Sequence, residues 1–270
     1  MKLQVFDFHV HLYPDALAPK AVPYLADRFG NAPAFDGTVE GMKSDLATSG
    51  VSCSLNLPVA TKPEQVHSIN EWARKINDEN GPVYSLATVH PDTEDIPGVM
   101  RGIQAAGFKG IKLHPEYELF TLDDPRVQPI FRACDELGLF LFLHAGGERV
   151  FEPPYHTSPT SIADLLVRYP HLTVVAAHLG GFHMWDESER VLIGKNLYLD
   201  LSHCFDWVPT DGQIVRMVRN HGADKILWGT DAPWQKPAYV LQRFLEQPFT
   251  TEEQEAILWN NARRLLGLPQ

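Results

Sequence analysis

The feature that most constrains the fold of this chain is a regular alternation of apolar, β-branched-rich runs with amphipathic stretches. The apolar runs predict eight buried strands, which begin near Leu3, Val51, Val83, Phe108, Leu139, Leu172, Leu197 and Lys225. The amphipathic stretches between them predict helices at residues 38–49, 64–77, 96–106, 125–137, 161–169, 185–193 and 212–220. Strands and helices that alternate in this way are typical of a parallel sheet covered by helices.

Eight such units in 270 residues match the size of a (β/α)8 TIM barrel, so we predict an α/β barrel that forms a single domain over residues 1–270. An open, doubly wound sheet is the alternative, because periodicity does not show closure. No Gly-x-Gly-x-x-Gly motif follows the first strand, where a dinucleotide-binding fold would carry one.

Two segments lie outside the regular repeat. The first strand-to-helix connection, residues 12–37, is long and rich in proline and aromatic residues. We interpret it as a loop that forms a pocket wall or lid, with a surface elaboration as an equal alternative. At the other end, residues 237–245 and 251–266 predict the last outer helix and an extra closing C-terminal helix, with Thr251 as the N-cap.

Charge and cysteine content narrow the function class. The formal net charge of -11 and the lack of a Lys/Arg run argue against a nucleic-acid surface. The three cysteines, Cys53, Cys134 and Cys204, are widely spaced and predict reduced thiols in a cytoplasmic protein. Met1-Lys2 leads directly into a strand, and no apolar run reaches transmembrane length, so we expect neither a signal peptide nor a membrane partner.

The first strand carries a possible metal-binding motif, His9-Val10-His11. Alternate residues of a strand point to the same face, so Asp7, His9 and His11 share one face. Two imidazoles aimed at one point suit a divalent metal. Taken alone, the motif is equally compatible with two satisfied core histidines.

Polar residues also follow several later strands. Lys112 and His114 end the fourth strand, His144 the fifth, His178 the sixth and Asp231 the eighth. In barrel enzymes the C-terminal ends of the strands carry the active site. Scattered core histidines would not share this polarity, so a catalytic site is favoured.

Five segments resemble the amidohydrolase superfamily: DFHVHLYP, GIKLHP, FLHAGG, SPTSIADLLVRYPHLTVVAAHLGG and ILWGTDAPW. The chain is similar to the amidohydrolase-2 group of metal-dependent TIM-barrel hydrolases, which includes aminocarboxymuconate semialdehyde decarboxylase. The resemblance implies one divalent metal held by His9, His11, His144 and Asp231, with His178 beside the metal-bound water. Zn²⁺ is the first expectation, and Mn²⁺ or Fe²⁺ suits the same donors. Asp7 is expected to support the site without binding the metal.

The leading hypothesis for function is hydrolysis of an amide, lactone or ester in a small, carboxylated substrate. A metal-activated water would attack the carbonyl, with Asp231 and His178 as the catalytic residues. Lys112 and His114 are expected to bind substrate. The resemblance also leaves open that Lys112 is carboxylated and bridges two metals, as in binuclear members of the superfamily, and a structural role for both residues is open. The alternative is non-oxidative decarboxylation at the same metal site. A non-catalytic binding protein would have lost a ligand residue, whereas all are present here.

Other polar residues near the strand ends receive no catalytic role: Asn56, Lys62, His90, Arg149, His156, His183, His203 and Trp234. His67, His171 and His221 fall in or beside predicted helices and are expected at the surface. The sequence leaves a homo-oligomer open.

Overall fold

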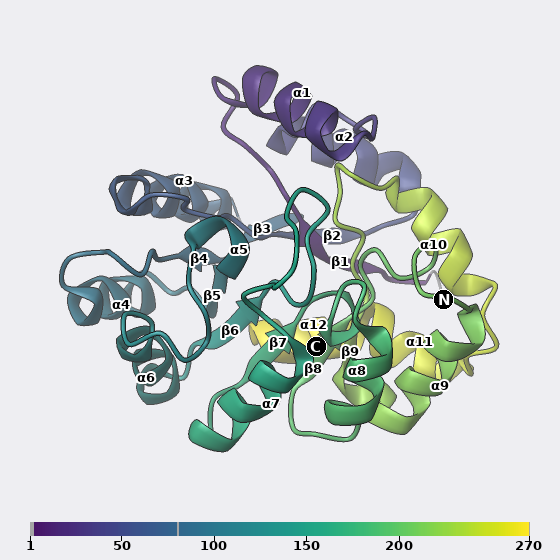
Figure 1. Ribbon diagram of the computed structural model, residues 1–270. Coiled ribbons are helices and arrows are strands. Elements are labelled where there is room, and N and C mark those ends of the chain that lie inside the picture. Colours follow the sequence, from purple (N-terminus) through teal and green to yellow (C-terminus); the bar gives the residue numbers. More distant parts are fainter. Residues whose placement is uncertain (1–2, 80, 270) are drawn as a thin grey trace.

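The computed structural model describes residues 3–79 and 81–269. Met1 and Lys2, which precede the first predicted strand, lie outside the described residues. All strand pairs are parallel, and helices surround them (Figure 1). The strands are β1 Phe6–Val10, β2 Cys53–Asn56, β3 Val83–Ser85, β4 Ala87–Thr88, β5 Gly110–Leu113, β6 Phe140–Leu143, β7 Val174–Ala176, β8 Tyr198–Asp200 and β9 Ile226–Leu227.

The strands form a closed ring, as the predicted TIM barrel requires. One sheet has the order β1-β2-β3 and the other β4-β5-β6-β7-β8-β9. The third predicted strand supplies both β3 and β4, which are separated only by Leu86. On the other side, Phe8 N donates to Trp228 O at 2.9 Å, and Asp231 N donates to His9 O at 2.7 Å. These bonds join the end of the last strand to β1.

The helices confirm the alternating pattern. They are α1 Ala18–Phe29, α2 Val39–Ser49, α3 Val66–Asp78, α4 Ile96–Ala105, α5 Pro115–Glu118, α6 Gln128–Leu137, α7 Pro159–Arg168, α8 Trp185–Val191, α9 Asp211–His221, α10 Pro237–Leu245, α11 Thr251–Glu255 and α12 Asn261–Leu266. Each of them is too short or too polar for a membrane crossing, over the residues described.

Strand alternation divides the core into an outer and an inner layer. Leu141 and Leu143 of β6 belong to the large cluster between strands and helices. Phe140 and Phe142 of the same strand belong to the inner cluster, together with Leu266 of α12. The extra C-terminal helix therefore packs against the barrel interior, and His144 continues the inward-facing series of β6.

The structure corrects four local expectations. Residues 12–37 were expected as a loop but contain the twelve-residue helix α1, in which Pro19 falls within the first turn, where proline is tolerated. The N-cap near residue 250 is Thr250, whose side chain accepts from Glu253 N, and not Thr251. The helix that follows it is interrupted by a π-helical turn at Ala256–Asn260.

The fourth correction concerns His221, which is buried and not at the surface. Its Nε2 lies 2.9 Å from Leu197 O, and its Nδ1 accepts from Gly194 N. Sequence position at the end of a helix did not reveal these partners. His67 and His171 are exposed, as predicted.

Candidate metal centre and active-site cavity

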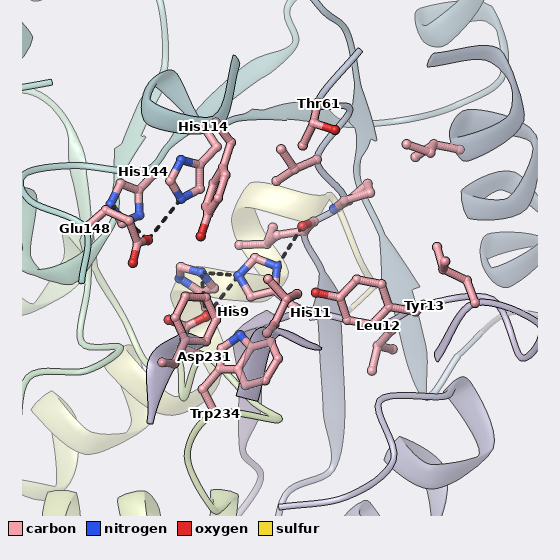
Figure 2. A pocket seen from close by; sticks show the side chains of 18 of the residues that line it. His9, His11, Leu12, Tyr13, Thr61, His114, His144, Glu148, Asp231 and Trp234 are labelled. Carbon is pink, nitrogen blue, oxygen red and sulfur yellow. Dashed lines mark hydrogen bonds and ion pairs between the residues drawn. The ribbon is translucent and has the colours of Figure 1, made fainter. Parts of the chain in front are cut away.

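A cavity of about 530 Å³ opens at the C-terminal ends of the strands (Figure 2). Its lining combines imidazoles and acids from the strand ends with apolar side chains from the connections. The lining residues are His9, His11, Leu12, Tyr13, Pro14, Leu17, Leu25, Phe29, Leu57, Pro58, Val59, Thr61, Gln65, Ser68, Ile69, Trp72, His114, Tyr117, His144, Glu148, Arg149, His178, Phe182, His203, Asp231 and Trp234.

His9, His11 and Asp231 converge at the base of this cavity. His9 Nε2 lies 3.3 Å from His11 Nε2, and Asp231 Oδ1 lies 2.9 Å from His11 Nε2 and 3.4 Å from His9 Nε2. The close approach of β1 to the segment after β9 depends on Gly229, where a Cβ would stand 2.7 Å from His9 Cβ. Two nitrogen donors and one oxygen donor therefore face a common point.

His178 and His144 extend this cluster. Donor atoms of His9, His178 and Asp231 lie within 4.8 Å of one another. His178 Nε2 lies 3.3 Å from His144 Nδ1. His144 itself groups with His114 and Glu148, whose donor atoms form a second set within 4.8 Å. The structure thus places all five predicted metal and catalytic residues around one cavity, with His144 at the boundary between the two sets.

His9 in β1 and His11 just after it are oriented through the ring nitrogens that face away from the cluster. His11 Nδ1 lies 3.0 Å from Leu57 O, and a carbonyl can only accept, so this nitrogen donates. His9 Nδ1 lies 2.6 Å from Asp200 Oδ2. In the neutral imidazoles both Nε2 atoms therefore carry the lone pair that a metal requires.

The other two histidines are held by the same means. His178 Nδ1 lies 3.0 Å from Ser202 O, which leaves Nε2 as the acceptor atom. His144 Nε2 lies 2.9 Å from Gly147 O, which leaves Nδ1 as the acceptor atom. These are the atoms that face each other at 3.3 Å. Burial also lowers the pKa of His178 to about 4, so its ring is neutral at pH 7.

Asp231 supplies a direct test of whether a cation suits the site. Its Oδ1 is buried and has no hydrogen-bond partner among the described residues. It faces His11 Nε2 at 2.9 Å, so two electron-pair donors oppose each other. Two such atoms repel unless a proton or a metal ion lies between them. This donor set of imidazole nitrogen and carboxylate oxygen therefore fits a divalent metal.

The backbone and charge state of Asp231 are consistent with a specialised site. Its φ of 64° lies in the left-handed region, as does that of His178 at 57°. Such conformations are costly for non-glycine residues and concentrate at functional sites. Burial alone would raise the pKa of Asp231, but the imidazoles of His9, His11 and His203 outweigh it and hold that pKa well below its usual value.

Asp7 and Asp200 support these residues from below. Asp7 Oδ1 accepts from Thr230 N at 2.9 Å and from His9 N at 3.2 Å, which ties β1 to the segment that carries Asp231. The predicted supporting role of Asp7 matches this geometry. Asp200 accepts from His178 N at 2.9 Å and also contacts His9. Its pKa is lowered, because the neighbouring His9 outweighs the effect of burial.

The structure separates the two residues predicted to bind substrate. His114 lines the cavity and stacks on His144 with ring centres 4.0 Å apart. Lys112 is fully buried, is absent from the lining, and lies over the Phe142 ring with Nζ 4.7 Å from its centre. Burial lowers the pKa of Lys112 to about 8. Its predicted contact with substrate is not supported by this placement.

Sequence reasoning missed several residues of the site, among them Asp200, Ser202, Glu148, Tyr13 and Tyr117. Asp200 ends β8, so the rule that selected His144 and Asp231 applies equally to it. Glu148 follows the Gly146-Gly147 pair directly, without a local pattern that distinguishes it from a surface residue.

Of the eight polar residues that received no role, three line the cavity: Arg149, His203 and Trp234. His203 Nε2 lies 3.2 Å from Asp231 Oδ2. Arg149 is the only lysine or arginine in the lining, over the residues described. The remaining five do not line the cavity: Asn56, Lys62, His90, His156 and His183.

Comparisons with known proteins agree with this architecture. The chain is 27% identical over 208 residues to 2-amino-3-carboxymuconate-6-semialdehyde decarboxylase of Dictyostelium discoideum, a match that covers 64% of this chain and 57% of that protein. It resembles a TIM-barrel protein of Bordetella bronchiseptica, with a TM-score of 0.78, 21% identity, and coverage of 98% of this chain and 99% of that one.

A second solved structure is 5-carboxyvanillate decarboxylase of Novosphingobium aromaticivorans, complexed with manganese and 4-hydroxy-3-methoxy-5-nitrobenzoic acid. Its TM-score is 0.74 at 15% identity, with 98% of this chain and 96% of that chain covered. At this identity the likeness shows the TIM-barrel fold. The model of the amidohydrolase family matches residues 6–268, nearly the whole chain. The chain therefore belongs to the amidohydrolase family.

Proposed function

We propose that this protein is a metal-dependent, non-oxidative decarboxylase of a small carboxylated substrate with aromatic or muconate-like character. The observation that carries the proposal is the convergence of His9, His11 and Asp231 on one point, with Asp231 Oδ1 buried and unpaired among the described residues. Hydrolysis was the first expectation from the sequence. The decarboxylases among the relatives named above favour the alternative.

The metal would be held by His9 Nε2, His11 Nε2 and Asp231 Oδ1, with His144 Nδ1 as the further donor. A divalent ion bound there supplies a Lewis acid that polarises a substrate oxygen and fixes the substrate's orientation. These nitrogen and oxygen donors suit Zn²⁺, Mn²⁺ or Fe²⁺. The manganese in the 5-carboxyvanillate decarboxylase structure places Mn²⁺ beside zinc as a first choice to assay.

The substrate carboxylate would meet the positive side of the cavity. Arg149 carries the one permanent positive charge in the described lining, and its guanidinium lies 4.9 Å from the centre of the Trp207 ring. Stacking on an aromatic ring restricts a guanidinium and favours a defined position. His114, beside Glu148 and His144, offers a second polar contact.

Decarboxylation breaks the bond between the carboxylate carbon and the substrate carbon, and CO2 leaves. The electron pair stays on the substrate carbon, which takes up one proton. We assign the relay of this proton to Asp231, which is ionised at pH 7 and takes up the proton from a neighbour before passing it to the substrate carbon. His203 Nε2, from which the proton can be resupplied, lies 3.2 Å from Asp231 Oδ2. His178, neutral at pH 7, is the neighbouring donor or acceptor.

We further propose that residues 1–270 act as one domain in the cytoplasm. The family match over residues 6–268 supports the first statement. The three free cysteines, Cys53, Cys134 and Cys204, support the second, because free thiols persist in a reducing compartment.

The experiment that tests the function compares two panels on protein loaded with Zn²⁺ or Mn²⁺. One panel contains hydroxylated benzoates and muconate semialdehydes and is assayed for CO2 release. The other contains lactones, amides and esters and is assayed for hydrolysis. We expect CO2 release from at least one member of the first panel. Hydrolysis without any CO2 release would restore the hydrolase hypothesis and refute this proposal.

A further inference from the structure

We infer that the substrate carries an apolar substituent, several carbons long, that extends from the metal-binding end of the cavity into a channel between α1 and α3. This inference rests on the proposed function, because it names the substrate class of the same site. It concerns the far side of the cavity, where none of the strand-end histidines lies.

The cavity has two chemically different sides. Figure 2 shows His114, His144 and Glu148 on one side of His11, and Tyr13 and Leu12 on the other. The lining also includes apolar residues of α1 and α3, among them Phe29 and Ile69. A substrate with only polar groups would leave this side in contact with water, which is unfavourable for apolar surface.

One wall of the channel is a face of α3. Ser68, Ile69 and Trp72 all line the cavity, and positions three and four apart lie on the same face of a helix. Ile69 and Trp72 are half-buried, so part of each side chain is free for contact. Among the described contacts, neither residue makes a hydrogen bond to the metal-binding group, so we assign them a role in binding and none in catalysis.

A second wall is α1, the helix inserted in the first connection. Leu25 and Phe29 lie one helical turn apart and both line the cavity. Phe29 packs edge-to-face on Trp234, with ring centres 4.9 Å apart, and Asn31 Nδ2 donates to Trp234 O. Trp234 lies three residues after Asp231, so this wall is attached to the segment that carries the proposed catalytic residue.

The mouth and size of the cavity agree with an extended ligand. Leu17, at the start of α1, lines the cavity and is 48% exposed, so part of its side chain is free to contact a ligand. The volume of about 530 Å³ falls in the range of about 300–1,000 Å³ that accommodates drug-sized molecules. A single carboxylated ring at the polar end would leave the channel between α1 and α3 unfilled.

The test measures binding of two probe series to the metal-loaded, full-length protein by titration calorimetry. One series is benzoate with its 4-ethyl, 4-butyl and 4-hexyl derivatives, and the other is the phenols with the same alkyl groups. We expect the Kd of the benzoates to fall by up to about fourfold for each added methylene, the value for full burial. The alkylphenols should show the same dependence on chain length at weaker overall affinity.

Two variants locate the channel. Ile69→Asp on α3 should abolish the chain-length dependence and leave the Kd of benzoate within twofold. Leu25→Asp on α1 should do the same from the other wall, which guards against a folding defect in one variant. His67→Asp adds an acid to the exposed side of the same helix and is the matched control; it should keep the full dependence.

The outcomes separate this inference from the proposed function. Benzoate binding without any gain from the alkyl chain overturns the channel and leaves decarboxylation untouched. Chain-length dependence in the phenols without binding of any benzoate supports the channel and counts against a carboxylated substrate. The inference is overturned if neither series binds. It is also overturned if the Kd depends on alkyl chain length as strongly in both wall variants as in the unaltered protein.

Discussion

The two sides of the cavity are built in different ways. On the polar side, His9, His11 and His178 end or follow barrel strands, and each is oriented by a hydrogen bond from its far ring nitrogen. On the apolar side, α1 and α3 contribute apolar side chains that are held by packing, as in the contact of Phe29 with Trp234. On our proposal, the barrel strands position the reacting groups, and α1 and α3 determine which substrate binds.

The largest effect is expected from a change at the centre of the polar side. Asp231→Asn removes a charged donor from the metal-binding group and the residue assigned to proton transfer. We expect CO2 release to fall by about 10³-fold or more, within the range of general acid-base catalysis combined with weakened metal binding. Steady-state kinetics on metal-loaded protein measure it. Turnover within tenfold of the unaltered protein would contradict the role of Asp231.

Lys112, which is buried in the barrel and does not line the cavity, tests whether a buried charge reduces stability. Its pKa is about 8 in the fold, against 10.5 for an unperturbed lysine, because burial disfavours the ammonium. The unfolded chain binds more protons between these values, so Lys112 contributes stability above pH 10.5 that is lost as the pH falls through 8. Lys112→Met should therefore raise the free energy of unfolding at pH 7 by on the order of 3 kcal/mol.

Urea unfolding at pH 7 and well above pH 10.5 checks this. The gain from Lys112→Met should shrink towards zero at the higher pH, because the lysine is then neutral in both states. An equal effect at both pH values, or destabilisation at pH 7, would show that Lys112 is stabilised by a partner that burial and charge do not account for.

A substitution of Asp200 tests whether the orientation of the His9 imidazole affects metal affinity. Asp200→Asn keeps the size of the side chain but loses the charge that faces His9 Nδ1 at 2.6 Å. We expect metal affinity to fall by about 10–100-fold, as is usual for groups that hold metal ligands in place. Competition with a chelator of known affinity measures it. Asp164→Asn, an exposed acid on α7, is the control, and equal affinities in the two variants would refute the role.

The smallest effect is expected on the apolar side. Trp72→Ala removes part of the α3 wall without reaching the metal-binding group. For a substrate with an alkyl substituent we expect KM to rise by about tenfold, with kcat within twofold. For the unsubstituted substrate neither constant should change. A fall in kcat for both substrates would show that the two sides are not independent.

The difference between residues at strand ends and residues in α1 and α3 also explains which features could be predicted from the sequence. Strand periodicity and the position of polar residues at strand ends predicted the barrel and placed His9, His11, His144, His178 and Asp231 around one cavity. Each of these depends on local order along the chain, because parallel strands bring their C-terminal ends to one face. Asp200 follows the same rule, and its role becomes visible only through its contact with His9.

The remaining features depend on contacts between distant segments. The α1 helix was missed because its prolines indicated a loop. Its apolar residues Leu25 and Phe29 pack against segments that become neighbours only in the folded chain, so the sequence did not reveal them as a helix face. His203 and Arg149 lie in connections whose path is not set by periodicity. The burial of Lys112 follows from the ring closure of the barrel, which encloses an inward-facing side chain on every side.

The central claim is that one metal ion, held by His9, His11 and Asp231, is required for decarboxylation. The most direct measurement is CO2 release by chelator-stripped protein as Mn²⁺ or Zn²⁺ is titrated in, with total metal per chain determined at each point. We predict no release before metal is added, then a linear rise that saturates at one ion per chain. Full activity in the stripped protein, or saturation only at two ions per chain, would contradict it.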